Sequence, residues 1–175
     1  MITTRGIDLT QMGLKDALDL AVLIEEEARE RYEEFAEQMD LHHTPEAATF
    51  FRFMAHNEEK HRAELWHRRR ELFLDDPVTV KRSMLFDVEA PEYDEVRVFM
   101  TQRQALEAAL RAEEKAHAFF VAALPRLTDP LVRSLFQELR DEEVLHQELV
   151  RRRHAELPPD PAFEAGDFAD EPVGQ

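Results

Sequence analysis

Four stretches of the chain repeat apolar residues at alternating intervals of three and four positions, a spacing that gathers side chains on one face of an α-helix. Four such helices can bury their stripes by packing against one another as a bundle. The stripe in the second stretch extends to Arg68 and Leu72 near its end. We expect the helices at about residues 10–38, 45–74, 93–127 and 130–157.

Turn signals predict where the helices begin and how they are connected. Thr10 is the predicted N-cap of the first helix, and Thr44 the predicted N-cap of the second, directly before Pro45. The links after the first and third helices are short, so each should join two antiparallel neighbours. Residues 75–92 are long enough to cross the length of a bundle. The sequence therefore predicts an all-α fold, an antiparallel four-helix bundle with a long crossover between the second and third helices.

The composition fits a single helical domain followed by a different kind of segment. The chain has 175 residues, only 4 Gly and 34% charged residues, which is the profile of long amphipathic helices. We assign residues 1–157 to the four-helix domain. Residues 158–175 are rich in Pro and acidic residues, and we expect a flexible tail there. Its apolar residues leave docking on a partner subunit or shell as an alternative.

Charge and cysteine content exclude several classes of function. The formal net charge is −16, whereas nucleic acid and anionic membrane surfaces attract basic proteins. No apolar run reaches the roughly 18–20 residues of a membrane-spanning helix, and residues 1–13 lack the features of a signal peptide. The absence of Cys excludes disulfides and thiolate metal sites. We therefore expect a cytoplasmic protein with no nucleic-acid or membrane partner.

Single carboxylates interrupt two of the apolar stripes. Glu25 is the only charge in the first stripe, and Glu113 is the only charge in the third. Their neighbours Glu26 and Glu114 fall outside the stripes and should face elsewhere. The same spacing rule distinguishes the inward carboxylates of the other two helices from their neighbours, because residues three and four apart share a face.

The second and fourth stripes each contain a Glu-x-x-His motif. An ionised carboxylate is costly to bury unless an opposite charge offsets it. Four inward Glu and two inward His on four helices therefore predict a metal centre. The candidate ligands, which are also the candidate catalytic residues, are Glu25, Glu58, His61, Glu113, Glu143 and His146.

The two halves of the chain resemble each other around these residues. Glu25 corresponds to Glu113 at an offset of 88 residues, and Glu58 corresponds to Glu143 at an offset of 85. Two similar hairpins facing each other would bring two equivalent half-sites together, which suits a pair of metal ions. Carboxylate and imidazole ligands suit iron, with Mn or Zn as possible substitutes. We therefore expect two Fe ions.

The spacing resembles that of the ferritin-like superfamily, in particular its rubrerythrin-like and bacterioferritin-like members. The resemblance covers residues 10–157 and rests on the motifs Glu25–Tyr32, Asn57–His61 and Glu142–His146. It implies a ferritin-like di-iron bundle in which Glu58 and Glu143 bridge the ions. Tyr32 is placed either to hydrogen-bond a ligand Glu or to pack in the core.

Four differences from these relatives make the predicted function more specific. Rubrerythrins carry a further inward Glu where this chain has Ala116, and bacterioferritins bind haem through a Met where this chain has Glu59. We therefore expect no haem. The absence of Cys excludes a rubredoxin-like domain in this chain, so electrons for a peroxidase cycle would come from an external donor. The tail does not resemble the fifth helix of cage-forming ferritins, which favours a homodimer or another small homo-oligomer.

These features predict a non-haem di-iron oxidoreductase that binds Fe(II) and oxidises it with O2 or H2O2. Either a ferroxidase or a peroxide-scavenging role in iron and oxidative-stress handling fits the ligands. Two alternatives remain open: a di-iron oxygenase acting on an organic substrate, and a non-enzymatic metal-binding or cargo protein. His117, one turn after Glu113, lies beside the stripe, and we expect it to support the site or face the surface.

Overall fold

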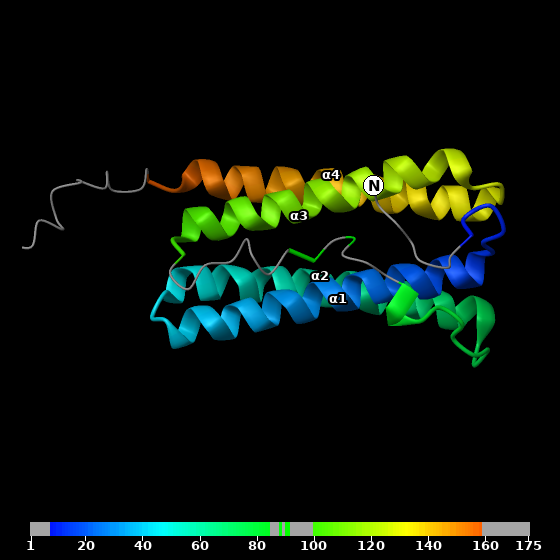
Figure 1. Ribbon diagram of the computed structural model, residues 1–175, viewed down its shortest axis with the longest axis horizontal. Coiled ribbons are helices and arrows are strands. Elements are labelled where there is room, and N and C mark those ends of the chain that lie inside the picture. Colours follow the sequence, from blue (N-terminus) through cyan, green and yellow to red (C-terminus); the bar gives the residue numbers. More distant parts are fainter. Residues whose placement is uncertain (1–7, 85–87, 89, 92–99, 159–175) are drawn as a thin grey trace, which may run out of the picture.

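The computed structural model describes residues 8–84, 88, 90–91 and 100–158. Within them the chain forms four long helices and no strand, which confirms the predicted all-α class. Figure 1 shows two helical hairpins that lie side by side along their length, α1 with α2 and α3 with α4. The helices are α1 (Leu14–Leu41), α2 (Pro45–Phe73), α3 (Gln102–Ala123) and α4 (Pro130–Glu156), with 3-10 turns η1 (Arg82–Met84) and η2 (Leu124–Arg126).

Two helices begin later than predicted, α1 also ends later, at Leu41, and α3 ends earlier, at Ala123. α1 begins at Leu14 with Gly13 as its N-cap, because the predicted cap Thr10 is in a turn and its hydroxyl donates to Asp8 at 2.7 Å. α3 begins at Gln102, where a capping box with Thr101 fixes its start. The predicted earlier start was therefore wrong for residues 100 and 101, whereas residues 93–99 lie outside the described residues.

Short turns hold each hairpin together. Thr44 is the N-cap residue of α2 as predicted, although its hydroxyl donates to the carbonyl of Met39 at 3.1 Å and makes no capping hydrogen bond to α2. Between α3 and α4, Asp129 caps α4 by accepting a hydrogen bond from Leu131 N at 2.7 Å. Both turns connect antiparallel helices, as the short links predicted.

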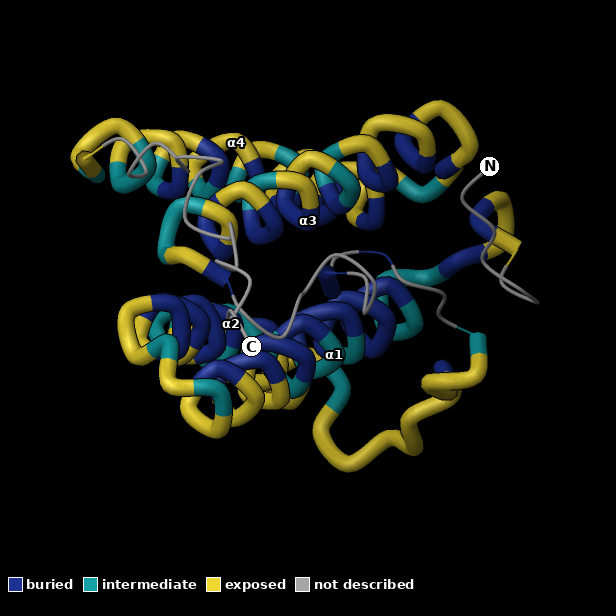
Figure 2. Tube along the Cα trace, turned by 60° about the vertical axis from the view of Figure 1, so that its left-hand side comes forward, coloured by how far each residue is buried: buried dark blue, intermediate teal, exposed yellow. Residues whose placement is uncertain are grey.

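The core consists of two apolar clusters, one toward each end of the bundle. One cluster contains Leu18, Phe120 and Phe136, and the other contains Phe35 and Phe51. Figure 2 shows that the buried positions of each helix face the other helices. In each helix the inward Glu falls between residues of the two clusters, so the apolar core is interrupted at mid-length by a layer of carboxylates.

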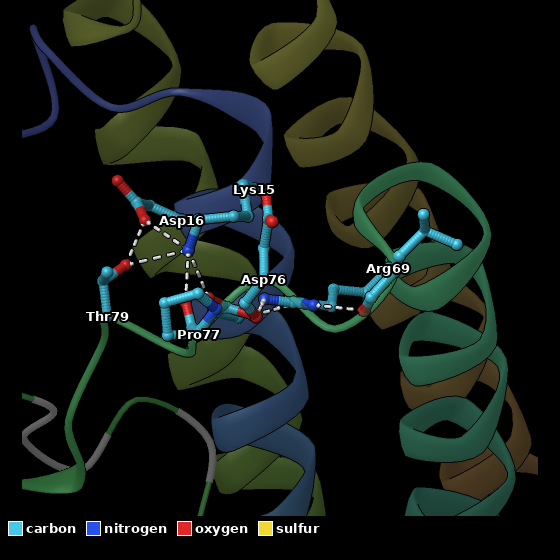
Figure 3. Close-up of polar contacts among 8 residues, drawn as sticks. Lys15, Asp16, Arg69, Asp76, Pro77 and Thr79 are labelled. Carbon is cyan, nitrogen blue, oxygen red and sulfur yellow. Dashed lines mark hydrogen bonds and ion pairs between the residues drawn. The ribbon is translucent and has the colours of Figure 1, made fainter.

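The start of the crossover is fixed to α1 and α2 by two cationic side chains (Figure 3). Arg69 donates to the carbonyls of Leu74 and Asp76 at 2.9 and 2.5 Å, and also to Asp19 Oδ1 at 2.8 Å. Lys15 donates to the carbonyl of Pro77 at 2.9 Å. The ion pair of Arg69 with Asp19 is buried, with side chains 1% and 0% exposed.

We call these contacts of Arg69 and Lys15 with the crossover the clamp. They show that the predicted end of the second stripe was wrong. Leu72 is 53% exposed, and Arg69 is buried in place of its neighbour Arg68. The reason is that the chain leaves α2 at Leu74, so the last turn needs a cation to bind the carbonyls of the departing chain. Apolar spacing alone contains no information about that requirement.

Candidate metal centre

The four stripe carboxylates are buried at mid-length of their helices. Glu25 is 4% exposed, Glu58 and Glu113 are 0% exposed, and Glu143 is 2% exposed. The predicted burial is thus confirmed for all four. Their neighbours are more accessible: Glu59 and Glu114 pair with Arg62 and Arg151, respectively.

Three of the six predicted ligands converge. Glu58, Glu113 and His146 each offer a ligand atom, and these atoms lie within 4.8 Å of one another. His146 Nδ1 lies 3.2 Å from Glu113 Oε2 and 3.9 Å from Glu143 Oε2. The three residues come from α2, α3 and α4, so both hairpins contribute to the group. It therefore exists only when the hairpins are packed together.

Glu25 and His61 lie outside this group of three. His61 Nε2 is 3.2 Å from His146 Nε2, and the two rings meet edge to face with centroids 4.7 Å apart. His61 Nδ1 lies 3.9 Å from Glu142 Oε2, a carboxylate that the stripe rule places outside the centre. The structure thus gathers Glu58, Glu113 and His146 around one position, whereas Glu143 lies beside this group and His61 at the edge of the site.

Two further side chains hold Glu113 in position. Tyr32, which is fully buried, donates its hydroxyl to Glu113 Oε1 at 3.4 Å and stacks on Phe51, so both of its predicted roles are confirmed. Gln147 donates its amide to the backbone carbonyl of Glu113 at 3.3 Å. The sequence analysis missed Gln147, although its place four residues after Glu143 puts it beside the stripe.

The electrostatics of the site follow from burial. Burial lowers the pKa of His61, and the positive charge of protonated His146 lowers it further. Both effects favour the neutral form of the His61 imidazole, which is the form that binds metal. Burial raises the pKa of Glu142, whereas the hydrogen bond from Arg62 lowers the pKa of Glu59. Glu59 thus behaves as a surface ion-pair residue.

The donor set fits a pair of divalent cations. Four carboxylates and two neutral imidazoles carry a formal charge of −4 when the carboxylates are ionised, and two divalent cations offset that charge. Oxygen and nitrogen donors without sulfur suit Fe, Mn and Zn. Hydrogen bonds to a ligand from behind, such as that from Tyr32 to Glu113, are typical of metal centres because they orient the ligand.

The fold and the buried Glu and His residues together define a ferritin-like protein. The family model Rubrerythrin matches residues 16–154, so the chain belongs to the rubrerythrin family, and the predicted resemblance is confirmed. No curated protein matches the chain.

Solved structures agree with this assignment. An uncharacterized conserved protein from Magnetospirillum magnetotacticum MS-1 is 28% identical, with a TM-score of 0.65 over 86% of this chain and 99% of that chain. A hypothetical protein from Pyrococcus furiosus is 20% identical, with a TM-score of 0.55 over 89% of this chain and 95% of that chain. The second likeness concerns the fold alone. None of the described helices is long and apolar enough to cross a membrane.

Proposed function

We propose that this protein is a non-haem di-iron oxidoreductase whose ligands are Glu25, Glu58, His61, Glu113, Glu143 and His146. The observation that carries the proposal is the convergence of Glu58, Glu113 and His146 on one buried position between the hairpins. Family membership supports it, because the rubrerythrin-like spacing of the Glu-x-x-His motifs is retained in both halves.

The protein residues have distinct tasks in this proposal. Following the family pattern, Glu58 and Glu143 would be shared between two ions, and Glu25 and Glu113 would each supply a single carboxylate to one ion. His61 and His146 supply neutral nitrogen ligands. Tyr32 keeps the Glu113 carboxylate oriented through its hydrogen bond. The apolar clusters on both sides of the layer limit access of water and strengthen these electrostatic interactions.

The reaction that we propose is the oxidation of Fe(II) by O2 or H2O2. Two bound Fe(II) ions would supply two electrons, which reduce either one H2O2 and two protons to two waters or one O2 and two protons to H2O2. The resulting Fe(III) would be the product of a ferroxidase. In a peroxide-scavenging cycle it would be reduced again by an external donor, because this chain has no Cys for a rubredoxin-type centre.

Charge around the site favours small polar reactants over an organic substrate. A pocket that reaches His61 has four charged lining residues, and three leucines also contribute to its walls. The charged residues are Glu64, Arg68, Glu138 and Glu142. An oxygenase for apolar substrates would need an apolar channel, so this lining supports the ferroxidase or peroxidase alternatives. We further propose that the protein acts in the cytoplasm as a homodimer, with the tail outside the catalytic unit.

An anaerobic Fe(II) titration followed by separate exposure to O2 and H2O2 tests the proposal. We expect two iron ions per chain and oxidation well above the rate of free Fe(II), monitored by the near-ultraviolet absorbance of ferric iron. The faster oxidant distinguishes a ferroxidase from a peroxidase. Oxidation at the rate of free iron, despite two bound ions, would contradict the enzymatic role and favour a metal-binding protein.

A further inference from the structure

The crossover covers the candidate centre where α1 and α3 lie. Val88 and Ala90 are 2% and 1% exposed. Lys115 on α3 donates to the carbonyl of Ala90 at 2.7 Å, and Arg31 on α1 donates to the carbonyl of Pro91 at 2.6 Å. Two cations from two helices thus hold adjacent carbonyls of the crossover.

The bundle is hollowed between α2 and α4. A pocket of about 200 Å³ lies there, with His61 in its lining and leucines of both helices among its walls. Its other polar lining residues are Glu64, Arg68, Glu138 and Glu142. Three carboxylates against one guanidinium give the lining a formal charge of −2. A pocket with this charge attracts cations and repels anions.

The pocket connects with the buried ligands through a series of short distances. Glu142, whose side chain is 43% exposed, lies 3.9 Å from His61 Nδ1. His61 Nε2 is 3.2 Å from His146 Nε2, and His146 Nδ1 is 3.2 Å from Glu113 Oε2. A chain of potential cation ligands therefore leads from solvent into the group of three, with His61 at its centre.

One ion pair spans the pocket. Arg68 on α2 donates to Glu138 Oε2 on α4 at 2.6 Å, and both side chains are 40% or more exposed. The guanidinium neutralises one of the lining carboxylates and places a positive charge in the path of an incoming cation. Because both side chains of the pair are exposed to solvent, breaking it costs little free energy.

We propose that this acidic pocket is the route by which divalent metal ions, Fe(II) in particular, reach the centre from solvent. The route rests on the function proposed above and adds residues that the ligand set does not include. Glu64 and Glu142 attract the ion, His61 passes it inward, and the Arg68–Glu138 pair restricts the passage. These side chains control the rate of metal uptake, whereas the six ligands determine how much metal is held.

Stopped-flow mixing of the apo-protein with Co(II) tests whether the pocket residues control the rate of metal uptake without changing the amount of metal bound. Co(II) bound by oxygen and nitrogen ligands absorbs visible light, so uptake is seen without any redox step. We expect Glu64→Gln and Glu142→Gln to slow uptake by about three- to ten-fold each at low ionic strength. Arg68→Gln should accelerate it. All three variants should reach the final occupancy of the wild type, and the differences should shrink at high salt.

Glu37→Gln is the matched control, because Glu37 is an exposed carboxylate on α1 away from the pocket. It makes the same change in net charge and should leave the uptake rate near that of the wild type. Unchanged rates in the Glu64 and Glu142 variants, with normal final occupancy, would overturn the route alone. A wild-type protein that takes up no metal would overturn the proposed function, and the route with it.

Discussion

Glu58 has no exposed surface, although a carboxylate is among the most strongly hydrated side chains. Three other carboxylates share the same layer, so ionising all four without bound cations would concentrate negative charge in the interior. Such an arrangement is unfavourable for folding by itself. We infer that the buried carboxylates lower the stability of the apo-protein. Bound cations would raise it again, because they bind the folded state and offset the negative charge.

Glu58→Gln should therefore separate stability from function. Gln has nearly the same shape as Glu but carries no charge. The substitution should therefore raise the free energy of unfolding of the apo-protein by about 1–3 kcal/mol. The same change removes a bridging ligand, so binding of two metal ions per chain should be lost. Thermal unfolding of the apo-protein and metal analysis after dialysis measure the two effects.

Glu59→Gln is the control at the next position. Glu59 pairs with Arg62 at 2.8 Å and its side chain is 44% exposed. Its replacement should leave metal binding intact and change stability by at most about 1 kcal/mol. Loss of metal in this variant, with binding retained in Glu58→Gln, would show that the stripe rule chose the wrong carboxylate.

The pKa of His61 predicts how stability depends on pH in the absence of metal. Burial and His146 lower the pKa of His61 in the folded protein, so the unfolded chain binds a proton at a higher pH than the folded chain does. Stability from this group is complete above the ordinary imidazole pKa of about 6.5. It declines as the pH falls below that value toward the folded pKa.

Chemical denaturation of the apo-protein at neutral and mildly acidic pH measures this effect. The wild type should lose more stability on acidification than His61→Gln, whereas His67→Gln, which alters an exposed residue of the same helix, should behave as the wild type. An identical loss in wild type and His61→Gln would mean that His61 titrates normally.

Among the elements, the C-terminal end of α2 depends most on one ion pair. Arg69 and Asp19 are both buried, and Arg69 also binds two carbonyls of the crossover. Arg69→Met would leave Asp19 with Lys15 as its remaining cationic partner. We expect a loss of about 3–5 kcal/mol in the free energy of unfolding, because an inadequately compensated charge stays buried.

Two further variants identify the cause of that loss. Arg70→Met changes an exposed neighbour and should cost little. Combining Arg69→Met with Asp19→Leu removes both charges and should recover part of the stability. If Arg69→Met unfolds no more easily than Arg70→Met, the clamp contributes nothing and the crossover is held by other contacts.

Leu74, where the chain leaves α2, has a backbone conformation that favours glycine. Its φ is 48° with ψ −126°, and its side chain is 73% exposed. Leu74→Gly should relieve this strain and raise the free energy of unfolding by about 1 kcal/mol after the entropic cost of glycine. Leu72→Gly, within the helix, should lower it by about 1 kcal/mol. Equal losses in both variants would contradict the strain at Leu74.

At the scale of the whole molecule, the sequence predicted what depends on helical periodicity. The four helices, the two hairpins and the burial of Glu25, Glu58, Glu113 and Glu143 all follow from residues three and four apart sharing a face. Inward positions are a local property of each helix. They could therefore be predicted without knowing how the helices pack.

Features that depend on contacts between distant segments could not be predicted in this way. The direction of the His61 ring is set by His146 on another helix. The start of α3 is a different case, because Thr101 and Gln104 form a local capping box that could have been predicted from the sequence. The clamp at Arg69 depends on where the crossover turns. The pocket between α2 and α4 likewise exists only because the two hairpins pack together.

The most direct test of the account is anomalous X-ray diffraction at the iron absorption edge, on crystals of the protein loaded anaerobically with Fe(II). The account predicts two iron peaks about 3.5–4 Å apart inside the bundle. One should lie among Glu58, Glu113 and His146, and the other nearer Glu25 and His61. Iron found only on surface carboxylates, or no peak in the buried layer, would contradict the central claim that these residues form a di-iron centre.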